Sequence, residues 1–212
     1  MKKKLSTSLI AFVVLMTTAQ AQENTIDGHE YVDLGLPSGT MWASCNVGAT
    51  KPEEYGDCFA WGETKTKDNY IFNTYFDNEW NKYNNGGGLT ELLPEDDAAY
   101  VNWGSNWRIP SWDQIKELID NCNWEWTKLN GVNGYKATSK TNGKSIFLPA
   151  AGWRNVASLT LAGSEGLYWS RTLDNDYSKS AEGLYFRSSY ISKNGDHKRI
   201  YGPSVRPVHL PK

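Results

Sequence analysis

Residues 111–122, SWDQIKELIDNC, contain the strongest local signal in the chain. Ser111 and Gln114 form a capping box, a pair of side chains that satisfies free backbone N–H groups at the start of a helix. Apolar residues then recur at the i, i+3, i+4, i+7 spacing of one helix face, as Ile115, Leu118, Ile119 and Cys122. The stretch predicts an amphipathic helix, with Cys122 as a small buried hydrophobe rather than a reactive thiol.

Shorter elements are expected before this helix. Residues 31–34 and 41–43 are apolar-rich runs on either side of the turn-forming sequence GLPSG at 35–39, which predicts two strands joined by a turn. A short helix is expected over residues 95–100, because Pro94 suits a first helical turn and the acidic residues that follow favour the positive end of the helix dipole.

Residues 51–94 have a different composition. They are rich in Asn, Asp, Tyr, Gly and Trp and show little periodicity, so we expect long loops there. A structureless segment of this length is unusual in a compact domain. Its aromatic residues, including Trp61, Tyr75 and Trp80, are therefore expected to pack the loops onto the domain body.

After the helix the sequence changes to short strands and turns. Residues 135–138 and 145–148 flank TNGK at 141–144, and Asn-Gly is the strongest short signal for a β-hairpin. Further strands are expected at 167–170, 184–187, 199–201 and 204–208. A helical middle followed by an antiparallel carboxyl-terminal half is an α+β layout.

The amino-terminal segment, residues 1–21, has the pattern of a cleavable signal peptide. Three lysines at 2–4 precede an apolar run at 9–16, and the segment ends in Ala-Gln-Ala at 19–21. The apolar run is much shorter than the roughly 20 residues that a membrane span needs. The nearest cysteine is Cys45, so no lipid-attachment site lies beside the apolar run. The sequence predicts export without a membrane anchor, to the periplasm, the cell surface or the medium.

The remainder of the chain is expected to be a short disordered leader, residues 22–28, followed by one domain, residues 29–212. Removal of the signal takes three lysines from the 22 basic residues and leaves all 24 acidic ones, for a formal net charge of −5. This acidic balance argues against nucleic-acid partners and against insertion into an anionic membrane. The sequence leaves the oligomeric state open.

The sequence predicts no metal ion and no cofactor. It has neither a C-x-x-C nor an H-E-x-x-H motif, and its histidines are widely spaced, at His29, His197 and His209. Three cysteines leave at least one thiol free within a single chain. Cys45 and Cys58 could form a disulfide in an exported protein.

Five phrases in the chain, in this order, resemble the Fibrobacter succinogenes major paralogous domain family: residues 31–43, 106–111, 147–152, 168–170 and 202–208. That family is similar to the C-type lectin-like fold, shared with formylglycine-generating enzymes and with the variable proteins of diversity-generating retroelements. The resemblance implies a compact α+β domain, two helices packed on a small twisted antiparallel sheet with long loops, and it implies a fold rather than an activity. Candidates for its core are Trp153, Trp169 and Phe186.

Residues 168–201 have the composition of a binding surface. Tyrosine offers large amphipathic contact at little entropy cost, serine and asparagine offer adaptable hydrogen bonds, and arginine offers multidentate ones. Retroelement-diversified relatives vary this same carboxyl-terminal stretch, so the resemblance extends to a diversified binding protein. The predicted ligand-binding residues are Trp169, Arg171, Asp174, Asn175, Asp176, Tyr177, Arg187, Ser189, Tyr190, Asn194, His197 and Arg199.

No catalytic motif accompanies these residues. Formylglycine-generating relatives use two late cysteines, whereas this chain has none after Cys122, and it lacks the G-x-S-x-G of serine hydrolases. Three adjacent residues, 174–176, do not supply the six to eight oxygens of a calcium cage. The sequence predicts a non-catalytic module that binds a protein or glycan outside the cytoplasm. The alternative is a structural or adhesin-type surface component, and a hydrolase with paired carboxylates is a lesser alternative.

The signal peptide gives the first testable prediction. When the full chain is expressed in a bacterial host, the exported fraction should begin at Gln22, because Ala19 and Ala21 fit the small-residue cleavage site. Intact mass spectrometry measures the loss of residues 1–21. Ala21→Arg should block this cleavage, and an exported wild-type protein that retains Met1 would contradict the assignment.

Overall fold

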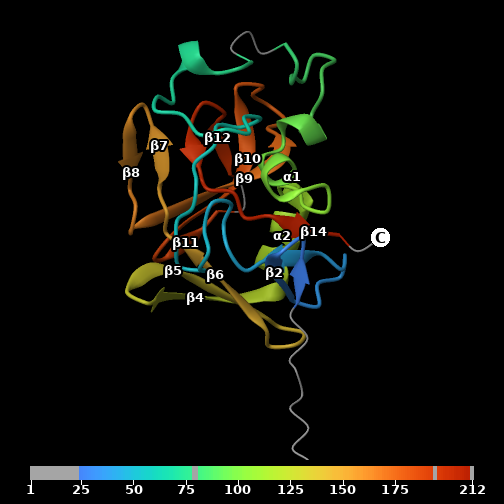
Figure 1. Ribbon diagram of the computed structural model, residues 1–212, viewed down its shortest axis with the longest axis vertical. Coiled ribbons are helices and arrows are strands. Elements are labelled where there is room, and N and C mark those ends of the chain that lie inside the picture. Colours follow the sequence, from blue (N-terminus) through green and yellow to red (C-terminus); the bar gives the residue numbers. More distant parts are fainter. Residues whose placement is uncertain (1–23, 78–80, 193–194, 211–212) are drawn as a thin grey trace, which may run out of the picture.

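A computed structural model describes residues 24–77, 81–192 and 195–210, so the expected signal peptide and Trp80 lie outside the described residues. Within these ranges the protein is mostly β, with four antiparallel sheets and only two α-helices (Figure 1). The fold is β-sandwich-like, and the expected C-type lectin-like α+β arrangement is wrong. The chain distributes its strands over several sheets, where the expectation was two helices on one small sheet.

The first sheet brings the two ends of the described chain together. Its order is β1-β2-β3-β14, formed by Thr25–Ile26, His29–Asp33, Met41–Ala43 and Val208–His209. The two strands predicted at 31–34 and 41–43 are confirmed, and they pair antiparallel with Val32 opposite Trp42. Thr25 and Ile26 lie in the expected disordered leader, which is instead ordered from Thr25, because β1 pairs with β2.

The second sheet has the order β4-β5-β6, formed by Cys122–Leu129, Val132–Ser139 and Ser145–Pro149. The predicted hairpin is confirmed, with Ala137 opposite Ile146. Strand β4 was not predicted. It begins at the residue after the helix, so no turn sequence separates the two elements.

The third sheet is built around β10 (Ser180–Arg187), which pairs with β9 (Glu165–Leu173), β11 (Tyr190–Ile191) and β12 (Asp196–Lys198). The fourth has the order β13-β7-β8, formed by Gly202–Pro203, Trp153–Asn155 and Ser158–Thr160. The strands expected at 167–170 and 184–187 are confirmed.

Two predicted strands near the carboxyl end are wrong. Residues 199–201 form a turn after β12, and only Val208 of the run 204–208 lies in a regular strand. Backbone hydrogen bonds hold these residues, for example from Val47 N–H to Val205 O (3.0 Å), and buried side chains add to them. Arg206, for example, is buried and donates hydrogen bonds from Nε to Asn46 Oδ1 (2.8 Å) and from Nη1 to Ala43 O (3.2 Å).

The predicted central helix is confirmed as α2 (Trp112–Asn121). Its capping box is complete, since the backbone N–H of Gln114 donates to Ser111 Oγ at 3.2 Å and that of Ser111 donates to Gln114 Oε1 at 2.8 Å. The other helix, α1 (Ala98–Trp103), begins three residues later than expected. Residues 94–96 form a 3₁₀ turn, and Asp97 caps α1 by accepting two backbone N–H bonds.

The core confirms most of the predicted apolar positions. Ile115, Leu118 and Ile119 of α2 pack with Phe186 and the inner side of the β4-β5-β6 sheet. Trp169 and Phe186 are fully buried, whereas Trp153 is only half-buried and does not belong to the core. Cys122 is buried as predicted, and burial raises the pKa of its thiol to about 11. The disulfide considered between Cys45 and Cys58 is not formed, because both thiols are free.

The long segment 51–94 is attached to the body by backbone bridges, such as that of Cys58 with Ser204, and by the buried side chain of Arg199. The Nη2 of Arg199 pairs with Asp77 Oδ2 at 2.7 Å, and its Nε donates to the hydroxyl of Tyr75 at 2.9 Å. The guanidinium also lies over the ring of Trp61, 4.7 Å from the centroid. Trp61 and Tyr75 are buried, as predicted for aromatics that pack these loops.

The buried ion pair keeps Asp77 ionised. Burial raises the pKa of this carboxyl, but hydrogen bonds from Arg199 and from the backbone N–H groups of Asn81 and Lys82 outweigh burial and lower the pKa overall. The pair therefore stabilises the fold above the ordinary carboxyl pKa, and this contribution is lost as the pH falls through the lowered value.

Among the helices of residues 24–77, 81–192 and 195–210, none combines the length and the hydropathy that a membrane span requires.

Arg199→Met should lower the free energy of unfolding by about 3–5 kcal/mol, because it leaves the Asp77 carboxylate buried without its cation. Urea denaturation followed by tryptophan fluorescence measures the change. Arg187→Met, at an exposed arginine, is the control and should change stability by less than about 0.5 kcal/mol. Adding Asp77→Leu to Arg199→Met should recover part of the loss. Equal stability of Arg199→Met and the wild type would contradict this account.

Candidate ligand-binding face

Alternate residues of strand β10 point to opposite sides of its sheet. Leu184 and Phe186 pack in the core with α2, and Ala181 packs in a second core cluster with Trp169 and Leu173. Glu182 and Tyr185 are half-buried, and Arg187 is exposed. Tyr185 and Arg187, two residues apart, lie on one side of the strand, where solvent reaches them.

Three rings form a continuous row on this side, which we call the aromatic row: His197, Tyr185 and Tyr190. The ring of Tyr185 lies 5.6 Å from that of His197 and 6.3 Å from that of Tyr190. The Arg187 guanidinium lies 5.8 Å from the Tyr190 ring centroid. The Tyr185 hydroxyl donates to Glu165 Oε2 at 2.7 Å, which fixes the middle ring. The row is therefore held in place before any ligand arrives.

Tyr185 and His197 are neutral near pH 7. Burial, together with the hydrogen bond to the Glu165 carboxylate, raises the pKa of Tyr185 to about 12. Burial lowers the pKa of His197 to about 4 against the opposing charge of Asp196, and its Nε2 is buried without a hydrogen-bond partner. The row offers apolar ring faces and hydroxyl groups, with one cation at its end.

A separate acidic pocket of about 380 Å³ includes Asp196, which precedes His197 in β12 and points to the opposite side of that strand. Asp174 shapes one wall, since its Oδ1 accepts the backbone N–H groups of Asp176 (2.9 Å) and Tyr177 (2.6 Å). Burial and the nearby carboxylates raise the pKa of Glu182. The residues that line the acidic pocket are Asp174, Asn175, Asp176, Tyr177, Glu182, Gly195 and Asp196.

Four of the predicted ligand-binding residues have structural roles instead. Trp169 is fully buried, and its Nε1 donates to Phe59 O at 2.8 Å. Arg199 is the buried arginine that holds segment 51–94. Asp174 is buried and organises its own turn. Arg171 bonds to Glu91, to Gln114 and to the Ile109 carbonyl, which ties β9 to the start of α2.

The other predicted residues fall into two groups. Asn175, Asp176 and Tyr177 are exposed at the acidic pocket, whereas Arg187, Ser189, Tyr190 and His197 lie at or beside the aromatic row. Asn194 lies outside the described residues. The sequence analysis missed Glu165, Glu182 and Tyr185. The alternation Tyr185-Phe186-Arg187 was a usable signal for Tyr185, whereas the half-buried Glu182 had no comparable signal.

No group of three or more His, Cys, Asp or Glu side chains is arranged to hold a metal ion in the described parts of the chain. The four carboxylates of the acidic pocket can accept hydrogen bonds from hydroxyl and amine donors, and the tyrosines can stack on apolar faces. The aromatic row and the acidic pocket can therefore contact a ligand through stacking and through hydrogen bonds.

A family model described as "Domain of unknown function (DUF8237)" matches residues 130–208. The match includes both the aromatic row and the acidic pocket, and its description names no activity. No curated protein and no solved structure matches the chain significantly.

The lowered pKa of His197 predicts a pH dependence of stability. The unfolded chain takes up this proton near the ordinary value of 6.5 and the folded chain only near 4, so the unfolded state binds more protons between these values. The free energy of unfolding should therefore fall as the pH falls through this window. Urea denaturation at about pH 7.5 and about pH 5 measures the difference.

His197→Gln removes the titrating group and should reduce that difference. Glu182, with its raised pKa, acts in the opposite direction but is present in both proteins, so the comparison isolates His197. An identical pH response in the two proteins would contradict a neutral, buried His197.

Proposed function

We propose that this protein is an exported, non-catalytic binding module that recognises a protein or glycan through the aromatic row and the acidic pocket, which together we call the candidate face. The observation that carries the proposal is the exposure of Tyr190: 47% of its surface faces solvent, while its ring lies 6.3 Å from that of Tyr185 at an interplanar angle of 57°. The core does not need this ring, and the preceding Arg187 is exposed as well.

The chemistry of the face supports a glycan or a protein surface as ligand. Tyrosine combines a flat apolar ring with a hydroxyl group, which suits both sugar rings and mixed protein surfaces. The carboxylates of the acidic pocket accept hydrogen bonds from sugar hydroxyls or pair with lysine and arginine side chains. A nucleic acid would meet these carboxylates as like charges, so it fits the face poorly.

Two features support a non-catalytic role. A general base near pH 7 needs a pKa near the working pH and an accessible atom. His197 has its pKa lowered to about 4 and its Nε2 buried, and Tyr185 stays protonated with its pKa near 12. Neither group suits proton transfer at neutral pH.

The resemblance to retroelement-diversified proteins belongs to the same proposal. If residues 168–201 vary, the fold limits variation to the exposed positions, because Trp169, Phe186 and Arg199 are fully buried. A reverse-transcriptase gene beside this one, with a near-copy of the segment that differs at adenines, would identify such diversification.

A glycan array and a surface-protein display screen with the mature protein test the proposal. For a ligand found in this way, Tyr190→Ala and Arg187→Ala should each weaken binding at least about tenfold, which corresponds to about 1.4 kcal/mol. Phe72→Ala is the matched control, since Phe72 is an aromatic residue of similar exposure (46%) in another part of the surface. Its affinity should equal that of the wild type. Unchanged binding by both test variants would contradict the site.

A structural or adhesin-type assembly role is the second candidate. The observation that favours it is the exposed hairpin β7–β8, which lies outside the candidate face.

A further inference from the structure

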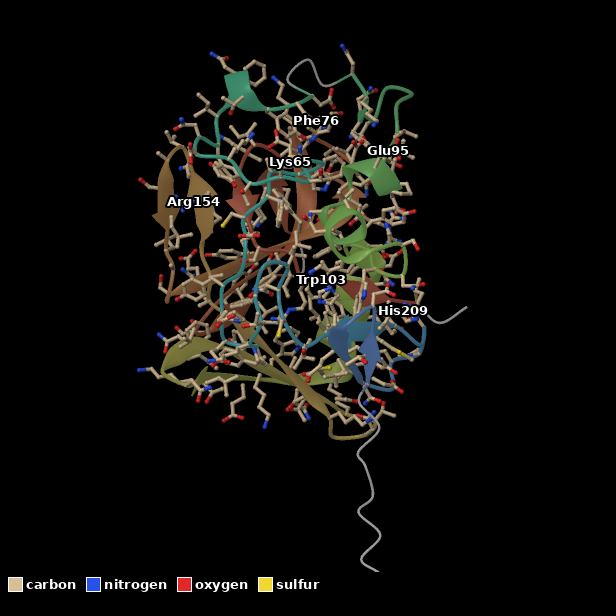
Figure 2. All side chains as sticks on the ribbon, in the orientation of Figure 1. Lys65, Phe76, Glu95, Trp103, Arg154 and His209 are labelled. Carbon is tan, nitrogen blue, oxygen red and sulfur yellow. The ribbon has the colours of Figure 1, made fainter. Side chains whose placement is uncertain are left out.

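The hairpin of β7 and β8 lies at the margin of the molecule, with β8 outermost (Figure 1). In the sheet order β13-β7-β8, strand β8 has a neighbour on one side only. Figure 2 shows Arg154 on β7 at the same margin. Strand β8 is therefore an open sheet edge.

This edge lacks the usual protection against pairing. Natural sheets blunt their edges with charged residues, proline or covering segments. Residues 155–164, NVASLTLAGS, contain neither charge nor proline. Three large apolar side chains there are exposed, namely Val156 (51%), Leu159 (42%) and Leu161 (45%). Neighbouring exposed apolar residues of this kind mark an interaction surface.

The turn of the hairpin adds a second, independent observation. Val156 has a φ of +56° in a two-residue loop between Asn155 and Ser158, where such turns use glycine, asparagine or aspartate. A β-branched residue in this conformation is strained, and it persists where the surroundings determine it. Here its N–H donates to Tyr70 O at 3.3 Å and its carbonyl accepts from Tyr70 N at 2.9 Å. The two bonds to Tyr70 hold Val156 in this conformation, and its apolar side chain is exposed at the tip of the hairpin.

The hairpin geometry also leaves hydrogen-bonding groups at the edge. In a two-residue hairpin the closing pair, here Asn155 and Ser158, is hydrogen-bonded, and the next pair, Arg154 and Leu159, is not. The N–H and C=O of Leu159 therefore point away from β7, toward the open side. They form the middle of a three-residue strand, Ser158–Thr160.

From these observations we propose that two copies of this chain associate through β8. The strands pair antiparallel about a two-fold axis at Leu159, and the two Leu159 residues exchange their N–H···O=C bonds. The β13-β7-β8 sheets of the two copies then join into one sheet of six strands. Each β8 strand covers the open edge of the other.

A second copy fits this edge better than an unrelated strand. Residues 155–164 carry no charge, so two identical hairpins meet without like-charge repulsion. The nearest cation, Arg154, is held within its own hairpin by a bond from Nη1 to Ala157 O at 3.0 Å. A self-complementary patch is the arrangement that two-fold dimers use.

Light scattering coupled to size-exclusion chromatography, over a concentration series of the mature protein, tests the proposal. The wild type should be a dimer that dissociates on dilution. Leu159→Lys should be monomeric at every concentration, because it places two ammonium groups at the axis. Val101→Lys is the matched control, an exposed apolar residue (50%) on α1, and should remain a dimer. A wild type that is monomeric throughout, or a Leu159→Lys protein that dimerises as the wild type does, would overturn the proposal.

Cross-linking gives a second test that does not depend on a destabilising charge. Directly opposite hydrogen-bonded residues have Cα atoms about 5.5 Å apart, within the range that a disulfide spans. Leu159→Cys should form a covalent dimer on mild oxidation, seen on a non-reducing gel. Val101→Cys and the wild type, which retains its own three cysteines, should not. Absence of a cross-link specific to residue 159 would exclude the axis at Leu159.

Discussion

The structure depends most on the buried guanidinium of Arg199. The segment 51–94 has almost no regular structure, and isolated backbone bridges such as those at Cys58 and Glu91 join it to the body. Arg199 adds an ion pair with Asp77, a hydrogen bond to Tyr75 and contact with the face of Trp61. Desolvating a guanidinium is costly, and these partners offset that cost.

Local signals predicted the elements whose pattern is self-contained. The capping box at Ser111, the Asn-Gly hairpin and the strands around the turn at 35–39 all appear where expected. The fold class was wrong because it rested on how elements assemble, which short phrases do not encode. Strand β4 follows α2 without an intervening turn, and irregular turns divide the strands of the described residues among four sheets. Periodicity within a window of a few residues cannot reveal either feature.

The predicted ligand-binding residues divide into exposed and buried side chains. Composition predicted a surface of Tyr, Arg, Ser and Asn, and it could not distinguish an exposed arginine from one that fills the core. Arg187 and Arg199 are similar in sequence context, yet one is exposed and the other fully buried. Arg199 is buried because its partners Tyr75 and Asp77 lie 124 and 122 residues earlier in the chain, which composition does not reveal.

The position of Arg199 near the end of the chain affects the order of folding. Its partner Asp77 lies 122 residues earlier. Until residue 199 has been synthesised, the segment 51–94 lacks the guanidinium that pairs with Asp77 and lies over the ring of Trp61. An emerging chain therefore stays open, and a contact so distant in sequence makes closure slow. Such a delay would suit the export that we propose, because a chain crosses a membrane unfolded and this native state becomes accessible only after the carboxyl end has been made.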